Sequence, residues 1–370
     1  MAFFAIIIAF TIIVLIHELG HFWAARRAGI HVVEFSFGMG PRLLHYTSKK
    51  SSTMYSLKLF PIGGSCRMLG EDESEDDPRA FGKKSVGWRI LTIAGGALMN
   101  FALALVISTI MAMFTSGTDA TVRGFTENSP IREAGVQIGD RIVRVNGRNV
   151  GIYGDFHLEM QRADGRPIDI VVERDGQRLD FTITPYNHDG RLILGFRPGT
   201  IVGPFFSATQ TSPDGTVYQV DDFEWVHRNG FFASLVDGFR QMVFSIRLVM
   251  FGLTQLVTGQ LSFGDMMGPI GIVSVLGDEV GYSLEIGGGM AAFWAIMSFT
   301  ALLSANLGVM NLLPIPALDG GRLVFLFLEA IRRKPVNPDK EGMVHFAGFV
   351  LLMVLVVFLA YNDIARLISG

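Results

Sequence analysis

The stretch His17-Glu18-Leu19-Gly20-His21 lies inside an almost unbroken apolar run that begins at Met1. Residues four apart share one face of a helix, so His17 and His21 can bind one metal ion together. Glu18 lies beside the pair, where a carboxylate can take a proton from a metal-bound water. Ionisable groups in a lipid-facing segment are costly and mark functional sites. The alternative is a helix that leaves the membrane, with both histidines reaching to the interface.

The composition lies between that of soluble proteins and that of proteins wholly within a membrane. Of the 370 residues, 49% are hydrophobic and only 18% are charged, and the mean hydropathy is positive. This predicts membrane spans together with a substantial soluble part. The net charge of −3 argues against nucleic acid as a partner. Cys66 is the single cysteine, which excludes an internal disulfide and a cysteine-based zinc site.

Four apolar runs are long enough to cross a lipid bilayer. They cover residues 1–25, 86–114, about 289–313 and 344–361. Basic residues are frequent between the first two runs and between the last two, so the positive-inside rule makes both connections cytoplasmic. Both chain termini are then expected outside. His17 and His21 should lie towards the cytoplasmic end of the first span.

The connection between the first two spans predicts β-structure. Residues 35–41 form a glycine-rich turn, and strand-like pieces follow at 53–60 and 65–69. These pieces are joined through Pro61-Ile62-Gly63-Gly64, which predicts a β-hairpin over 53–69 that dips into the membrane from the cytoplasmic side. An unwound substrate segment could add to it as a strand, with Gly63 and Gly64 leaving room for close approach. The alternative is a hairpin that only packs on the spans.

A soluble, charged region follows the second span. Residues 121–185 alternate in polarity and contain the turn signals Asn146-Gly147 and Asp175-Gly176, flanked by predicted strands. The region resembles one PDZ domain of the bacterial protease-associated kind. Residues 231–257 are apolar but carry three charges near helical spacing, which predicts an interfacial helix.

The predicted fold class is therefore an α-helical integral membrane protein with about four transmembrane helices, a membrane-dipping β-hairpin and one inserted extracytoplasmic PDZ domain (α+β). The predicted domains are a membrane core in two parts, a PDZ domain and a connecting region. Their residues are 1–118 and 286–370 for the core, 119–186 for the PDZ domain and 187–285 for the connecting region.

A third metal ligand must come from elsewhere, because catalytic zinc takes three protein ligands and a water. The third span ends in Asn311-Leu312-Leu313-Pro314-Ile315-Pro316-Ala317-Leu318-Asp319-Gly320-Gly321. Spans one and three both end on the cytoplasmic side, so Asp319 should lie at the depth of His21 and complete the site. Its alternative role is the N-cap of a helix that begins at Gly320.

Two asparagines and the remaining histidines are expected to have other roles than binding the metal. Asn311 could hydrogen-bond a substrate carbonyl or main chain, or cap the ending helix. Asn100 in the second span is more typical of an interhelical hydrogen bond than of a catalytic group. The other histidines lack partners at ligand spacing and are interpreted as structural or solvated; they are His31, His45, His157, His188, His227 and His345.

These motifs together resemble the site-2 protease family of intramembrane zinc metalloproteases, and within it the bacterial regulator-of-sigma-E group. The resemblance covers nearly the whole chain and rests on His17-Glu18-x-x-His21, the hairpin, Met99-Asn100-Phe101, the PDZ domain and the Asn311 to Gly320 motif. It implies a Zn²⁺ enzyme of the bacterial inner membrane that cuts pre-trimmed, single-span membrane proteins, such as anti-sigma factors or remnant signal peptides. Their outer portion would meet the PDZ domain.

Glu18 would then activate the zinc-bound water and return the proton to the leaving amine. Enterobacterial members carry two PDZ domains and this chain carries one, which leaves the individual substrate open. Two rival functions remain from the sequence. One is a membrane-anchored zinc protease that cuts soluble or misfolded proteins at the cytoplasmic face, and the other is a non-catalytic PDZ membrane scaffold. Asp319 at the end of a later span argues against the first. The second would have no reason to keep His17, Glu18, His21 and Asp319 together.

Overall fold

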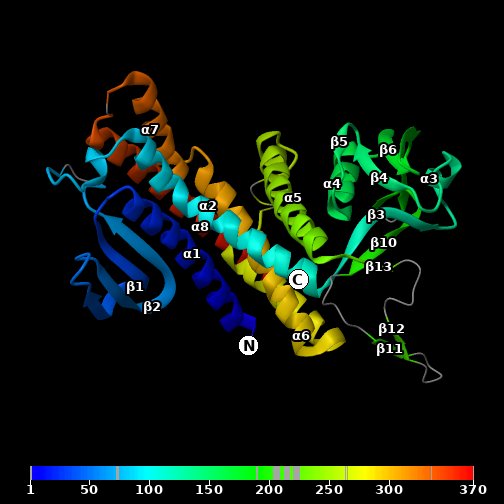
Figure 1. The fold of residues 1–370 in the computed structure, drawn as a ribbon, viewed down its shortest axis with the longest axis horizontal. Helices are drawn as coiled ribbons and strands as arrows, with labels where there is room; N and C mark the ends of the chain where they lie inside the picture. Colours follow the sequence, from blue (N-terminus) through cyan, green and yellow to red (C-terminus); the bar gives the residue numbers. More distant parts are fainter. Residues whose placement is uncertain are drawn as a thin grey trace. The chain divides into compact units, whose positions relative to one another are not determined.

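The computed structural model describes residues 2–71, 75–188, 191–202, 209–211, 217–219, 226–262, 264, 266–334 and 336–369. The chain divides into two compact units (Figure 1). The first joins Met1–Ala104 to Val249–Gly370, and the second is the intervening Leu105–Leu248. These divisions differ from the predicted domain boundaries, because a long helix crosses each junction.

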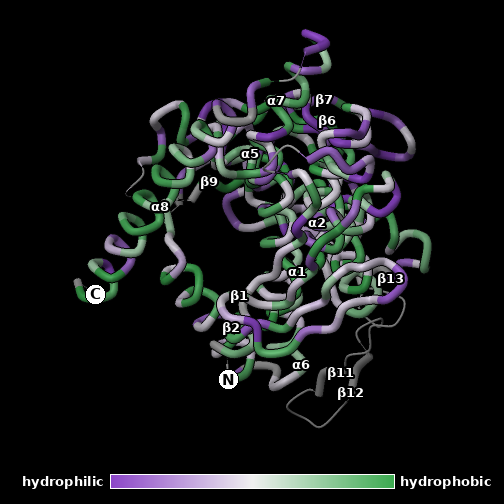
Figure 2. The backbone as a smooth tube through the Cα atoms, turned by 90° about the vertical axis from the view of Figure 1, so that its left-hand side faces the viewer, coloured by the Kyte–Doolittle hydropathy of each residue, from purple (hydrophilic) through white to green (hydrophobic). Residues whose placement is uncertain are grey.

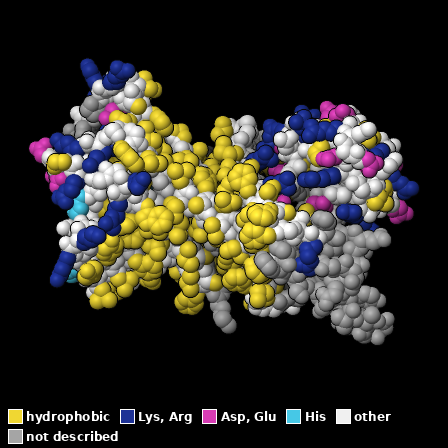
Figure 3. All heavy atoms as spheres, in the orientation of Figure 1, with side chains coloured by type: hydrophobic (Ala, Val, Ile, Leu, Met, Phe, Trp, Pro, Cys, Tyr) yellow, Lys and Arg dark blue, Asp and Glu magenta, His cyan; other side chains and the backbone are white. Residues whose placement is uncertain are grey.

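The first unit consists mainly of long apolar helices. They are α1 (Ala2–Arg27), α2 (Val86–Phe114), α6 (Pro269–Leu312), α7 (Asp319–Arg332) and α8 (Pro338–Ser369), with a 3-10 turn η1 (Phe81–Lys83). Four stretches among the described residues, 4–27, 86–114, 288–312 and 340–368, are long and apolar enough to span a membrane, as predicted. Figure 2 shows the hydrophobic colour along these helices. In Figure 3, hydrophobic side chains cover the helices and basic ones gather around β1 and β2.

The third apolar run belongs to a helix that begins twenty residues earlier than predicted. Pro269 is the first residue of α6, where a missing N–H costs nothing. Asp363 of α8 accepts hydrogen bonds from the N–H groups of Gly268 and Gly271 at 3.0 and 2.8 Å. Gly288, with φ of +66°, interrupts the helix where the apolar part begins.

Helices α1 and α2 cross at a pair of glycines. A methyl group added at Gly20 would collide with the carbonyl group of Gly95, and one added at Gly95 would stand 2.7 Å from the carbonyl oxygen of Gly20. Glycine at both positions therefore allows the two helices to approach closely. An ion pair between Arg89 and Glu329, 2.8 Å long, joins α2 to α7.

The predicted hairpin over 53–69 is wrong in its pairing. The sheet has two long strands, β1 (Val32–Thr47) and β2 (Met54–Met68), and residues 61–64 lie within β2 instead of forming a turn. Phe35 pairs with Cys66 on one side and with Tyr55 on the other. The two pieces expected to pair with each other therefore flank the first part of β1.

Both strands bend sharply enough to pair twice. Gly38 and Gly40 of β1 and Gly63 of β2 have φ between +78° and +89°, which glycine adopts without a Cβ clash. The glycine-rich stretch predicted as a turn is thus the bend of β1. From one edge to the other, the paired segments run 64–68, 32–37, 54–58 and 42–47. Residues 64–68 form one edge of the sheet.

The second unit is a mixed sheet with helices. Its elements are β3 (Ser116–Phe125), α3 (Pro130–Glu133), β4 (Arg141–Val145), β5 (Arg148–Asn149), α4 (Tyr153–Ala163), β6 (Ile168–Arg174), β7 (Gln177–Ile183), β8 (Tyr186–His188), β9 (Arg191–Ile193), β10 (Phe196–Val202), β11 (Thr209–Thr211), β12 (Val217–Gln219), β13 (Val226–Arg228) and α5 (Phe231–Val257). The main sheet has the order β13-β10-β3-β4-β6-β7, so it continues past the predicted boundary at residue 186. Its core includes Ile142, Ile168, Ile170 and Val172, which are fully buried.

Both predicted turns of this unit are confirmed. Val145 pairs with Arg148 across Asn146-Gly147, and Arg174 pairs with Gln177 across Asp175-Gly176. All four turn residues have positive φ, as a two-residue hairpin of this kind requires. Helix α5 has the predicted bounds and packs on α4, where Arg247 donates to Asp155 at 2.9 Å.

Candidate metal centre

His17 and His21 project from one face of α1 and are both buried. Their Nε2 atoms lie 3.1 Å apart. The Nδ1 atom of His21 lies 2.9 Å from the main-chain carbonyl oxygen of Thr92 in α2. A carbonyl oxygen only accepts hydrogen bonds, so His21 Nδ1 carries the proton and its Nε2 presents a lone pair. That tautomer is the one that can bind a metal through Nε2.

Asp319 comes from the loop after α6 and is the first residue of α7. The N-cap is Leu318, and Asp319 therefore does not hold the capping position that was its alternative role. Ala317, with φ of +77°, donates its N–H to Nδ1 of His345 on α8 at 3.0 Å. A methyl group added at Gly321 would stand 2.7 Å from the carbonyl oxygen of Ile315, so this glycine lets α7 start tightly against the loop.

The carboxylate of Asp319 meets both imidazoles. Its Oδ2 atom lies 3.1 Å from His17 Nε2 and 3.3 Å from His21 Nε2. This oxygen is buried and has no hydrogen-bond donor among the described residues. The structure thus brings together the three residues that the sequence proposed as ligands, from α1 and α7.

The spacing of these three atoms fits a zinc ion. Zinc bonds to nitrogen and oxygen are about 2.0–2.1 Å long, so a tetrahedral site places its ligand atoms about 3.3 Å apart. The observed separations are 3.1, 3.1 and 3.3 Å. Three electron-rich atoms at this distance, one of them a buried carboxylate oxygen, repel each other unless a cation lies between them.

Glu18 lies next to the two histidines and against strand β2. A methyl group added at Gly64 would stand 3.5 Å from Cγ of Glu18, and Glu18 also interacts with the backbone of Cys66. Gly63 of β2 lies near Val14 of α1, and Thr11 of α1 donates to the Pro61 carbonyl of β2 at 3.0 Å. The edge of the β1–β2 sheet therefore runs along α1 beside the glutamate.

Three more residues line the histidines. Asn311 is buried, with its Nδ2 atom 3.5 Å from His17 Nδ1. Asn100 is fully buried, with its Nδ2 atom 3.2 Å from the same His17 nitrogen. A methyl group added at Gly96 would stand 2.5 Å from His21 Nε2 and 2.6 Å from His17 Nε2. Glycine at this position lets α2 pass directly behind the ligand atoms.

His345 was interpreted as structural or solvated, and its contact with Ala317 is a structural one, although sequence reasoning did not identify this partner. A single histidine in an apolar helix has no spacing that signals a role, and its contact with Ala317 depends on how α8 meets the loop. His157 packs edge-on to Tyr153, as a structural residue would. The side chains of His188 and His227 lie outside the described residues.

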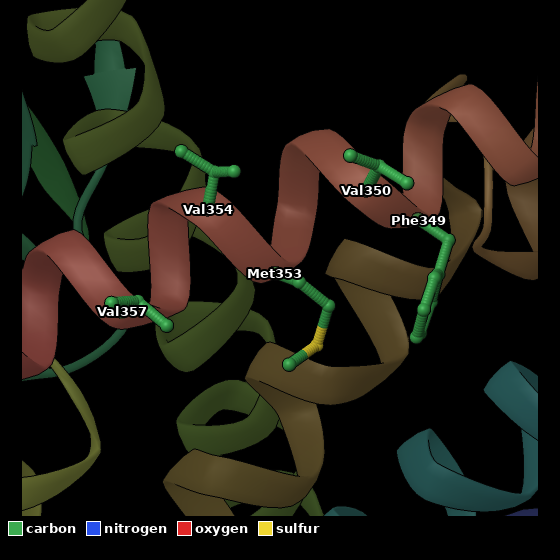
Figure 4. A pocket seen from close by; sticks show the side chains of 5 residues that line it. All are labelled: Phe349, Val350, Met353, Val354 and Val357. Atoms are coloured by element: carbon green, nitrogen blue, oxygen red, sulfur yellow. The ribbon is translucent and has the colours of Figure 1, made fainter.

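An apolar hollow on α8 lies apart in the sequence from His17, His21 and Asp319. It is lined by Phe349, Val350, Met353, Val354 and Val357 (Figure 4). All five side chains belong to one span and carry no titratable group, so the hollow offers no chemistry. An apolar helix surface of this kind is typical of contact with lipid tails.

A buried pair of imidazoles and a carboxylate next to a glutamate, among apolar spans, is typical of a membrane-embedded metallopeptidase. The sequence pattern of peptidase family M50 matches residues 5–355, and the chain belongs to this family, the site-2 proteases. A Clostridium acetobutylicum protein that is named as a zinc metalloprotease is 36% identical to this chain, with 98% of both chains covered. Zinc metalloprotease RasP of Geobacillus kaustophilus is 30% identical, with 97% of both covered. The regulator of sigma-W protease RasP of Bacillus subtilis is 30% identical, with 98% of both covered.

Proposed function

We propose that this chain is an intramembrane zinc metalloprotease that hydrolyses peptide bonds within or near transmembrane segments of membrane proteins. The observation that carries the proposal is the convergence of His17 Nε2, His21 Nε2 and Asp319 Oδ2 at the end of membrane-length helices. A scaffold has no use for three metal-binding groups in an apolar setting, where each is costly to bury.

The residues around the site divide the work of amide hydrolysis. His17, His21 and Asp319 would hold a zinc ion, which would supply Lewis acidity to the scissile carbonyl and to a water molecule. Glu18 accepts the proton of the attacking water and returns it to the leaving amine as the C–N bond breaks. The products are a carboxylate and an amine. Asn311 donates a hydrogen bond to the substrate carbonyl or main chain.

The edge of the β1–β2 sheet holds the substrate. A helical peptide bond must unwind before hydrolysis, and each freed backbone group in an apolar setting costs several kcal/mol, roughly, unless it finds a partner. Residues 64–68 pair with β1 on one side, and among the described strands none pairs with their outer edge. This edge runs beside Glu18. It is therefore suited to add an unwound substrate segment as a strand, with Gly63 and Gly64 at the entry.

The substrates are single-span membrane proteins already trimmed by another protease. The Bacillus subtilis relative is named for regulation of sigma-W, which supports anti-sigma-type regulators, alongside remnant signal peptides. The enzyme resides in the bacterial inner membrane with both termini outside. Residues 119–186 form the core of a PDZ domain on the outer side, which meets the extracytoplasmic portion of the substrate.

Purified enzyme in detergent, incubated with a synthetic single-span substrate and with soluble casein, tests this function. The proposal expects cleavage of the single-span substrate within its apolar segment, mapped by mass spectrometry, and loss of cleavage with a zinc chelator. Cleavage of casein with the helical substrate left intact would instead identify a membrane-anchored protease of soluble proteins. A chain that binds no zinc and cleaves neither substrate would favour the scaffold.

A proline scan tests the substrate edge separately. Proline removes a backbone donor, so substitutions at 65–68 should reduce cleavage of the helical substrate while zinc and folding persist. The opposite edge, residues 43–46, provides the matched control, because it is also an outer segment of the same sheet. Equal effects at both edges would remove strand addition from the mechanism.

A further inference from the structure

One face of α2 lies behind the two histidine ligands. Thr92, Gly96 and Asn100 follow each other at four-residue spacing and therefore share this face. The Thr92 carbonyl fixes the ring of His21, and Gly96 leaves space for both Nε2 atoms. The third position, Asn100, faces Nδ1 of His17 at 3.2 Å.

The chemistry of His17 decides what this contact is. His17 Nε2 points at Asp319 and His21, so it is the atom offered to the metal. A neutral imidazole with an unprotonated Nε2 carries its proton on Nδ1. His17 Nδ1 is therefore a donor, and the group opposite must accept. An amide presents either its oxygen or its nitrogen to a given neighbour, and its partners decide which.

The surroundings of Asn100 agree with an accepting oxygen. With the amide nitrogen towards His17, the Oδ1 atom of Asn100 is buried without a partner in the described part of the chain. That placement also turns two N–H donors, from Asn100 and from His17, towards each other. Rotating the amide by half a turn puts Oδ1 where it accepts the proton of His17 Nδ1 and removes this donor–donor contact. The position without a described partner then holds the amide N–H, so the contact with His17 decides the orientation.

We propose that Asn100 is a positioning residue, which accepts a hydrogen bond from His17 Nδ1–H and thereby holds Nε2 towards the metal. The proposal rests on the proposed zinc site. It gives the polar residue of the second span a specific role beyond joining helices. Partners of this kind fix the tautomer and orientation of a ligating imidazole, and their loss typically lowers metal affinity by about 10- to 100-fold.

Asn100 suits this role better than Asn311. The Asn100 amide is nearer to Nδ1, at 3.2 Å against 3.5 Å, and is completely buried. Its main chain is held as well, because Ser304 of α6 donates to the Asn100 carbonyl at 2.8 Å. Asn100 thus has a fixed position, whereas Asn311 lies where the third span ends and the substrate enters.

The test measures the zinc dissociation constant of the purified full-length chain by competition with a chelator. Asn100→Leu keeps the size of the side chain and removes the acceptor. Asn100→Thr has a shorter side chain that does not place an acceptor at His17. These helices tolerate threonine, since the hydroxyl groups of Thr92 and Thr300 each donate to a carbonyl of their own helix, at 2.8 and 2.7 Å. Asn100→Asp keeps an accepting oxygen. Ser304→Ala disturbs the same helix contact without touching His17.

The proposal expects zinc affinity to fall at least 10-fold in N100L and N100T and to stay within about 3-fold of wild type in N100D and S304A. The absorption spectrum of the cobalt-substituted protein should differ from that of wild type in N100L and match it in S304A. Wild-type affinity in N100L or N100T would overturn the proposal. So would an equal loss in S304A, because that would indicate a packing role. A wild-type chain that binds no zinc would instead overturn the proposed function itself.

Discussion

A methyl group added to Gly96 would stand 2.6 Å from Nε2 of His17, so α2 approaches the metal-binding nitrogen as closely as a backbone can. The same methyl would stand 2.5 Å from Nε2 of His21. Neither ring can retreat freely, because the opposite nitrogens face Asn100 and the Thr92 carbonyl. The size of residue 96 therefore controls the metal centre.

Gly96→Ala should lower zinc affinity by about 10-fold or more, because the new methyl displaces both ligand nitrogens. Metal content after dialysis is the measurement. Gly87→Ala is the matched control, since Gly87 is in the same helix and nothing lies within 4 Å of an added Cβ. Normal zinc content in G96A would show that the two rings can move aside.

Replacing His345 should disturb the metal centre from a distance. His345→Leu removes the acceptor for Ala317 N–H, which holds the loop before Asp319. We expect activity and zinc affinity to drop several-fold, towards about 10-fold. His345→Asn, whose side chain offers an oxygen near the Nδ1 position, should restore much of both. Equal losses in the two variants would mean that the ring itself, and not the hydrogen bond, supports the loop.

Glu34 should make the β1–β2 sheet sensitive to acid. A hydrogen bond from Arg42, together with one from Ser56, lowers the pKa of Glu34 from 4.5 to about 2. Burial acts in the opposite direction but is outweighed. A carboxylate with a depressed pKa stabilises the fold fully above pH 4.5 and loses this contribution as the pH falls towards 2. The contribution is about 1–3 kcal/mol, given that Arg42 is half exposed to solvent.

Thermal unfolding of wild type and of Glu34→Gln measures this contribution. A chelator is present in both samples so that metal binding does not affect the comparison. The wild-type protein should be the more stable at pH 6, and the difference should fall by more than half at pH 3. A difference that is the same at both pH values would show that Glu34 does not titrate with the predicted shift.

Much of this architecture follows from local sequence features. Apolar length predicts the spans, and the i, i+4 spacing of His17 and His21 predicts a shared metal. Asp319 could be proposed as a ligand because two spans are predicted to end at one depth. The pairing of β1 with β2 could not be predicted, because one segment of β1 pairs with two distant segments of β2 and only the folded chain decides which. The partner of His345 could not be predicted for a similar reason, since this contact joins α8 to the loop before α7, and the two meet only in the folded chain.

The orientation in the membrane is still a prediction from charge. In a Cys66→Ser background, a cysteine at exposed position 157 should react with an impermeant reagent added outside, and one at exposed position 49 should not. After lysis, both cysteines should react equally, which is the control that each position is accessible in the folded protein. The reverse pattern would place residues 119–186 in the cytoplasm and would remove the charge argument for the depth of Asp319.

Glu18→Gln tests the central claim most directly, with zinc content and cleavage of a single-span substrate measured on the same sample. Glu18 is proposed as the base and not as a ligand, and the amide cannot accept the proton of the attacking water. The account predicts one zinc per chain, as in wild type, with cleavage reduced by at least about 10²-fold. Cleavage at the wild-type rate with zinc bound would contradict it.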